Sequence, residues 1–211
     1  IVAVAVCALV GVLVEILAYR PVRKAGPMSA LITALAMSIF LENLAMVLFG
    51  AKPHNVQAIF SLPTITVGGV SLPLNVLLTI GIGVAMMLCM QLFVKKTKLG
   101  KAMRAVSEDM DAARLMGINV NSTISFTFAV GSALAGIGSV LYCCSYPQAT
   151  PTMGSMLGLK AFVAAVLGGI GSIPGAMVGG IVIGLCECFV SAIGLSAWKD
   201  AVTFAILIIV L

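Results

Sequence analysis

The feature that most constrains this chain is a series of apolar stretches, several of them close to 20 residues long. A helix needs about 20 mostly apolar residues to cross the hydrocarbon core of a bilayer. Apolar residues make up 61% of the chain and charged residues only 9%, whereas soluble domains contain about 45–50% and about 25%. The sequence therefore predicts an all-α fold, a polytopic transmembrane helical bundle.

Seven apolar segments are expected to enter the membrane, with the last one truncated. They are residues 1–18, 29–49, 74–94, 122–143, 156–168, 176–192 and 201–211. Proline lacks a backbone N–H, so Pro21 and Pro27 are expected to break the helix after the first segment. The sequence starts without Met and without a basic leader, so the first segment is not expected to be a complete signal peptide. Together the segments predict one transmembrane domain over residues 1–211, incomplete at both ends.

The basic residues gather in two of the loops between these segments. Nine of the twelve Lys and Arg residues lie there: Arg20, Arg23, Lys24, Lys95, Lys96, Lys98, Lys101, Arg104 and Arg114. Short cytoplasmic loops carry such an excess of positive charge, and alternating spans place both loops on that side. The net charge of +5 therefore indicates membrane topology and contacts with lipid headgroups. It does not indicate a nucleic-acid partner.

The longest polar stretch runs from residue 95 to residue 121 and holds nine of the nineteen charged residues. Ser107 is expected to cap a short helix over 107–118, and Gly117 is expected to end that helix in the left-handed conformation. Three acidic residues suit the positive end of its dipole, namely Glu108, Asp109 and Asp111. The stretch is therefore expected to be a folded cytoplasmic loop on which a partner docks.

Part of this loop resembles a known motif. The loop contains Asp111-Ala112-Ala113, followed by three further residues and Gly117. This pattern resembles the acidic-Ala-Ala-x-x-x-Gly loop of ABC importer permeases, on which the ATPase subunit sits. Residues 103–106 and 114–119, with the glycine-rich stretch 168–176, look like the branched-chain amino-acid permeases of that superfamily, the LivH type. The Ile-x-Leu-Pro of the broader importer pattern is absent. The resemblance extends over essentially the whole chain.

The resemblance implies a permease subunit of an ATP-binding cassette importer in the bacterial cytoplasmic (inner) membrane, carrying branched-chain or related small amino acids. It implies two ATPase subunits at the cytoplasmic face, a second permease subunit, related or identical, and an extracytoplasmic solute-binding protein. It also implies further spans outside this sequence. The ATPase-coupling residues would be Asp111, Ala112, Ala113, Arg114 and Gly117. The chain has no Walker sequence, so it is expected to be neither an enzyme nor a cofactor-binding protein.

The glycine-rich stretch is expected to be a structural turn between two membrane segments. Its residues are Gly168, Gly169, Gly171, Ser172, Pro174 and Gly175. No Lys follows the glycines, so a phosphate-binding loop is disfavoured. The turn either lies at the cytoplasmic surface or turns back within the membrane, where protein or water satisfies its backbone.

Small residues that recur every fourth position let helix backbones approach closely. Four such rows are expected to be packing faces: Gly131, Ala135 and Ser139; Ser132 and Gly136; Ala161, Ala165 and Gly169; and Ala176, Gly180 and Gly184.

Polar residues within apolar segments are costly and usually face protein or water. Glu42 and Asn43 are expected either to line the translocation path or to form hydrogen bonds between helices. Glu187 is expected to be a buried carboxyl bonded to a neighbouring helix. In the outer loop, residues 63–72 are expected to form a hairpin with Gly68-Gly69 as its turn, and His54 is expected to be solvated.

Two other functions are weighed. An ion- or proton-coupled secondary transporter would use Glu15, Glu42 or Glu187 and a broken helix at the glycine-rich turn. A membrane-embedded enzyme is disfavoured because the single His lies in a loop and no protease motif is present. The six cysteines lack metal-ligand spacing, so they are expected to be apolar packing residues and no metal site is expected.

Overall fold

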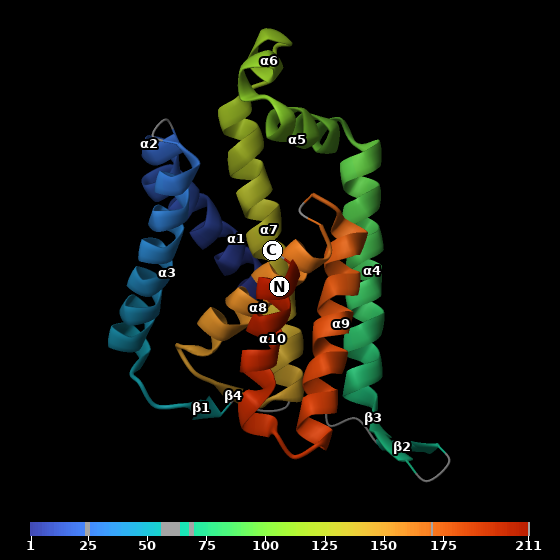
Figure 1. The fold of residues 1–211 in the computed structure, drawn as a ribbon. Coiled ribbons are helices and arrows are strands. Elements are labelled where there is room, and N and C mark those ends of the chain that lie inside the picture. Colours follow the sequence, from blue (N-terminus) through green and yellow to red (C-terminus); the bar gives the residue numbers. More distant parts are fainter. Residues whose placement is uncertain (24–25, 56–63, 68–69, 170, 211) are drawn as a thin grey trace. The chain divides into compact units, whose positions relative to one another are not determined.

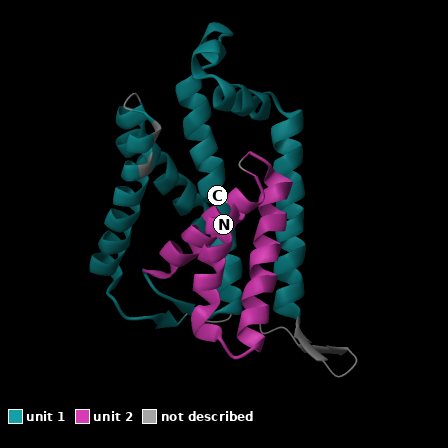
Figure 2. Ribbon diagram, viewed as in Figure 1, with its two compact units in different colours: residues 1–151 teal, residues 152–211 magenta. Residues whose placement is uncertain are grey.

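The computed structural model describes residues 1–23, 26–55, 64–67, 70–169 and 171–210 (Figure 1). They fall into two compact units, Ile1–Pro151 and Thr152–Leu211 (Figure 2). Five helices in these residues are long and apolar enough to cross a membrane: Val2–Val22, Met28–Phe49, Leu74–Lys96, Val120–Ser145 and Ile173–Ala192. The other two predicted segments form shorter helices, so the expected polytopic helical fold is confirmed.

The first helix of unit 1 continues through Pro21, which the sequence interpretation had wrongly placed at a break. It consists of α1 (Val2–Val14), the π-helical turn η1 (Glu15–Tyr19) and α2 (Arg20–Val22). In η1 the N–H of Arg20 bonds to the carbonyl of Glu15, five residues back. Such a widened turn loosens the hydrogen-bond ladder, and we attribute the tolerance of the Pro21 ring to it.

Three long helices complete the membrane-spanning part of unit 1: α3 (Pro27–Phe49), α4 (Leu74–Lys96) and α7 (Val120–Ser145). Pro27 lies in the first turn of α3, where its missing N–H costs nothing, so the expected boundary there is correct. The side chain of Asn119 caps α7 by accepting a hydrogen bond from the N–H of Ser122.

The polar segments of unit 1 lie at opposite ends of α4 and α7 (Figure 1). One end holds α2, α5 (Lys98–Glu108) and α6 (Met110–Leu115). The other holds β1 (His54–Asn55), which pairs antiparallel with β4 (Gln148–Ala149). The two predicted cytoplasmic loops are therefore at one end of this unit, and the predicted outer loop, which contains β1, is at the other end together with β4.

The predicted hairpin is also present at this outer end. Its strands are β2 (Thr64–Val67) and β3 (Val70–Pro73), paired antiparallel with Val67 opposite Val70. Pro63 and the predicted turn Gly68-Gly69 lie outside the described residues. His54 is exposed, and its Nε2 lies 3.0 Å from the carbonyl oxygen of Phe49, as suits a solvated loop residue.

Small residues bring α1 and α7 into close contact. A Cβ on Gly136 would lie 3.1 Å from Cα of Val4 and from Cβ of Cys7, and a Cβ on Gly11 would lie 1.9 Å from Oγ of Ser132. The row of Ser132 and Gly136 is therefore a packing face, as predicted. In the row beginning at Gly131, no described atom lies within 4 Å of a Cβ built on Gly131, so no packing contact is seen at that position.

Unit 2 contains α8 (Met153–Leu167), α9 (Ile173–Ala192), the short 3₁₀ turn η3 (Ser196–Trp198) and α10 (Lys199–Val210). Backbones of α8 and α9 meet closely at Ala164 and Gly168 on one side and Gly175 and Gly179 on the other. Of the predicted rows Ala161, Ala165, Gly169 and Ala176, Gly180, Gly184, Gly180 is at the margin of this contact, because a Cβ there would lie 3.9 Å from Cβ of Ala164, whereas Gly169 and Gly184 have no described atom within 4 Å of a Cβ. Four-residue spacing exists on adjacent faces of both helices, so spacing alone does not select the right one.

Candidate functional site

The charged loop between α4 and α7 folds into two helices, not the single one predicted. Thr97 caps α5 by accepting from the N–H of Gly100, and α5 continues through Ser107. The hydroxyl of Ser107 donates to the carbonyl of Arg104, so the prediction that Ser107 caps the docking helix is wrong. Ser107 is part of α5, because Val106 in the last turn of this helix is buried against the start of α7.

Asp109 takes the capping position of α6. Its Oδ1 accepts hydrogen bonds from the N–H groups of Asp111 at 2.8 Å and Ala112 at 3.1 Å. The bonds from Ala112 and Asp111 stabilise the carboxylate and lower the pKa of Asp109 below its ordinary value of 3.8. Asp111 lies in the first turn of α6, as expected. Glu108 is instead the last residue of α5, so it does not lie in the first turn of α6 as predicted.

A small apolar core fixes α6 to its neighbours. Val106 of α5, Ala113 of α6 and Val120 of α7 are buried together, and Ala105, Ile118 and Ile124 pack against them. Of the two alanines in the motif, only Ala113 belongs to this core, with 3% exposure, and Ala112 is exposed. The loop is therefore a folded extension of α7 and not a flexible linker.

We expect Ala113→Leu to displace α6, because the added carbons have no room in the core of Val106 and Val120. Overpacking of this kind costs about 1–3 kcal/mol. Ala112→Leu adds the same volume at an exposed position and is the matched control. The measurement is the temperature at which half of the purified protein still elutes as a monodisperse peak. Equal losses for the two variants would contradict the packing.

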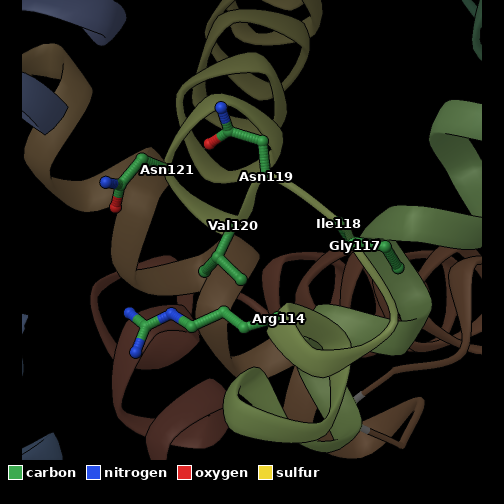
Figure 3. Close-up of a pocket in the computed structure, with 6 residues that line it drawn as sticks. All are labelled: Arg114, Gly117, Ile118, Asn119, Val120 and Asn121. Atoms are coloured by element: carbon green, nitrogen blue, oxygen red, sulfur yellow. The ribbon is translucent and has the colours of Figure 1, made fainter.

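Beyond α6 the loop presents an exposed edge. Gly117 has φ +81°, the left-handed conformation predicted for it. Leu115 and Met116 just before it are 90% and 83% exposed, and Arg114 pairs with Asp111 at 3.1 Å. A pocket of about 310 Å³ is lined by Arg114, Gly117, Ile118, Asn119, Val120 and Asn121. Figure 3 shows the Arg114 side chain extending from α6 past Val120.

The glycine-rich turn joins α8 to α9 through two residues in the left-handed region. Gly169 has φ +86° and Gly171 has φ +99°, conformations that glycine adopts without strain. The hydroxyl of Ser172 then caps α9 by accepting from the N–H of Gly175 at 3.2 Å, and Pro174 lies in the first helical turn. Each predicted polar or glycine residue thus has a definite position in the turn.

A buried charge cluster links the end of the first helix of unit 1 to the start of α7. Glu15 is fully buried, and its carboxylate pairs with Arg23 and accepts from the hydroxyl of Ser125. The Arg23 guanidinium also donates to Oδ1 of Asn121 at 2.9 Å. We call these four residues the Glu15 cluster.

A second charge cluster joins all three helices of unit 2. Nζ of Lys160 in α8 lies 2.9 Å from Oε1 of Glu187 in α9 and 2.8 Å from Oδ1 of Asp200 in α10. Thr203, which is 1% exposed, donates to Oε1 of Glu187 at 2.8 Å. The expectation of a partnered Glu187 is therefore confirmed. We call these four residues the Lys160 cluster.

The sequence interpretation singled out only the glutamates of these clusters. It assigned Arg23 to the topology of the chain and left Lys160 outside the two basic loops. Two signals were available: the four-residue spacing of Glu15, Tyr19 and Arg23, which places them on one helix face, and an isolated lysine within an apolar segment, which needs a partner.

Glu42 and Asn43 belong to neither cluster. The amide of Asn43 donates to the carbonyl of Ile39 in its own helix at 2.7 Å and has no other hydrogen bond among the described residues. Glu42 is half-buried, and within the described part of the chain its carboxylate has no hydrogen-bond or ion-pair partner. Within the described residues, neither side chain makes the interhelical hydrogen bond considered for it.

Comparison with known proteins gives a consistent result. The family described as "Branched-chain amino acid transport system / permease component" matches residues 1–211. The high-affinity branched-chain amino acid transport system permease protein BraD of Pseudomonas aeruginosa is 39% identical over 205 residues, 95% of this chain and 67% of the relative. The corresponding protein LivH of Salmonella typhimurium is 41% identical over 204 residues, 94% of this chain and 66% of the relative.

A more distant similarity is found to the ribose import permease protein RbsC of Escherichia coli, 26% identical over 190 residues, 87% of this chain and 59% of that relative. The chain spans about two thirds of the length of BraD and LivH. No solved structure gives a significant match.

Proposed function

Because the chain belongs to the family of branched-chain amino acid transport permeases, we propose that it forms part of the path of an ATP-binding cassette importer. Members of this family are membrane permeases and not themselves enzymes. The chain is accordingly a multi-pass protein of the cytoplasmic membrane, and the proposed cargo is a branched-chain or related small amino acid. Both units belong to one permease domain in this proposal, since the family match covers both.

The observation that carries the proposal is the folded loop of α5 and α6. Energy must arrive from outside the chain, because the sequence has no nucleotide-binding motif. Two ATPase subunits dock at the cytoplasmic face, one of them on Asp111, Ala112, Ala113, Arg114 and Gly117. The buried Ala113 joins this docking helix to α5 and α7, so a displacement of α6 has to move the ends of both helices.

The remaining partners follow from the same family membership. A second permease subunit, related or identical, completes the path, and an extracytoplasmic binding protein delivers the solute. Glu42 and Asn43 are proposed to line the path, a role that suits the Glu42 carboxyl, which has no partner among the residues that the structure describes. The turn from Gly168 to Gly175 has a structural role and holds α8 against α9.

The alternative of a secondary transporter is not favoured. The similar proteins are components of branched-chain amino acid transport systems. In addition, two of the three carboxylates considered for ion coupling, Glu15 and Glu187, are held in ion pairs with Arg23 and Lys160.

The deciding experiment uses the complete transporter, purified with its partners and placed in liposomes with the binding protein. We expect uptake of labelled leucine to require ATP on the cytoplasmic side and to continue when proton and sodium gradients are abolished. We expect Asp111→Lys to reduce copurification of the ATPase, with Lys52→Glu in the opposite loop as the charge-reversal control. Uptake that needs an ion gradient and no ATP would reject the proposal.

A further inference from the structure

The Glu15 cluster is an unusual concentration of paired polar groups beside a membrane helix. Glu15 is completely buried, and both of its carboxylate oxygens are engaged, one by Arg23 and the other by Ser125. The Arg23 side chain is 15% exposed and uses a second nitrogen to bind Asn121. The guanidinium therefore bridges the first helix and the start of α7.

The backbone of the first helix is adapted to this arrangement. Glu15 begins the π-helical turn and Tyr19 ends it. The ring of Tyr19 contacts Phe128 of α7, with ring centroids 4.9 Å apart. Glu15, Tyr19 and Arg23 therefore all face α7. Single π-helical turns within α-helices are frequently found at functional sites. This one sets the register of three contacts with α7, which are made by Glu15, Tyr19 and Arg23.

The two helices are in contact along a continuous seam. On α7 the contacting residues are Asn121, Ser125, Phe128, Ser132 and Gly136, whose spacing of four, three, four and four places them on one helix face. Away from the Glu15 cluster, the seam consists of small and apolar groups in close packing contact. Charge-assisted hydrogen bonds are directional, so the cluster at the end near α6 also resists sliding.

The docking helix is connected to this same end of α7. Only residues 116–119 separate α6 from α7, and Ala113 packs against Val120 at the first position of α7. Asn121, which receives the Arg23 bond, is the next residue. A displacement of α6 therefore reaches the first turn of α7 at the point where the Glu15 cluster holds it.

We infer that Glu15 and Arg23 are positioning residues. When α6 is displaced and moves the start of α7, they transmit this movement from α7 to α1, so that α1 and α7 move as one body. The inference rests on the proposed function, because it assigns a route to the force that a docked ATPase supplies. Glu15 and Arg23 touch neither nucleotide nor solute in this role. Their effect is on the coupling between ATP hydrolysis and transport.

The test measures leucine uptake and ATP hydrolysis in the same liposomes, again with the complete transporter. We expect Arg23→Gln to lower uptake per ATP hydrolysed about tenfold while the ATPase still copurifies. Arg23→Lys keeps the charge and is expected to recover part of the loss. Arg20→Gln is the control, because it removes an exposed guanidinium one turn earlier in the helix. This guanidinium has no ion-pair partner among the described residues, so uptake per ATP hydrolysed is expected to stay within about twofold of the parent value.

A second pair of variants guards against misfolding. Ser125→Ala removes one hydrogen bond to Glu15 and is expected to lower uptake per ATP by a smaller factor than Arg23→Gln. Ser122→Ala, at an exposed position of the same helix, is its control. If Arg23→Gln and Ser125→Ala lower only the yield of the complex and leave uptake per ATP unchanged, the cluster is merely structural and the inference is wrong. If the unaltered complex shows no ATP-dependent uptake, the proposed function fails and the inference falls with it.

Discussion

Replacing Gly175 with alanine is expected to separate α8 from α9 and to cost about 3 kcal/mol or more, at the upper end for overpacking. The added Cβ would lie 1.9 Å from the carbonyl oxygen of Gly168 and 3.0 Å from its carbonyl carbon. Both atoms belong to the backbone, so no side-chain rotation can relieve the clash. The two helices have to move apart, and the contact between Gly179 and Ala164 one turn further along is lost with them.

Gly184→Ala is the matched control, because it adds the same methyl group to α9 where no described atom lies within 4 Å. We expect it to be neutral or slightly stabilising, since alanine favours the helix more than glycine does. The measurement is the thermal stability of the purified protein in one detergent, followed by the loss of its monodisperse peak. Equal stability of the two variants would show that α8 and α9 do not meet at Gly175.

Removing the Lys160 charge is the second change with a large expected effect. Lys160→Met keeps the length of the side chain but leaves Glu187 and Asp200 facing each other without a cation. Breaking a buried ion pair from one side costs about 3–5 kcal/mol. The side chains of Lys160 and Glu187 are each 21% exposed and that of Asp200 is 35% exposed, so we expect the lower end, about 3 kcal/mol.

Repulsion between the carboxylates of Glu187 and Asp200 can be tested separately. Adding Glu187→Gln and Asp200→Asn to Lys160→Met removes the unpaired charges, so the triple variant is expected to be more stable than Lys160→Met alone. Lys52→Met, in the exposed loop after α3, is the control for loss of a lysine. A triple variant less stable than the single one would show that repulsion between the carboxylates does not dominate.

Much of the architecture was accessible from the pattern of apolar residues. The limits of α4 and α7 differ from the predicted 74–94 and 122–143 by two residues at most, because bilayer thickness fixes how many apolar residues a span requires. The left-handed Gly117 was also predictable, because a helix commonly ends on such a glycine.

At several positions the sequence allowed more than one local structure, and tertiary contacts selected among them. Ser107 and Asp109 are both good capping residues, and burial of Val106 at the end of α5 decided for Asp109. Likewise, two adjacent faces of α9 carry small residues, and the close backbone contacts with α8 are made at Gly175 and Gly179. Pairing partners far apart in sequence, such as Glu15 and Ser125, leave no local signal.

The exposed apolar surface of the long helices has a consequence for how this protein unfolds. Residues such as Val47, Phe49, Leu185 and Phe189 are 65% or more exposed, so burial of apolar side chains within the chain contributes little to holding the helices together. In lipid or detergent, each helix retains its own backbone hydrogen bonds after the bundle separates. Far-ultraviolet circular dichroism would therefore change little on denaturation, and a probe of helix proximity is needed to follow the loss of the native state.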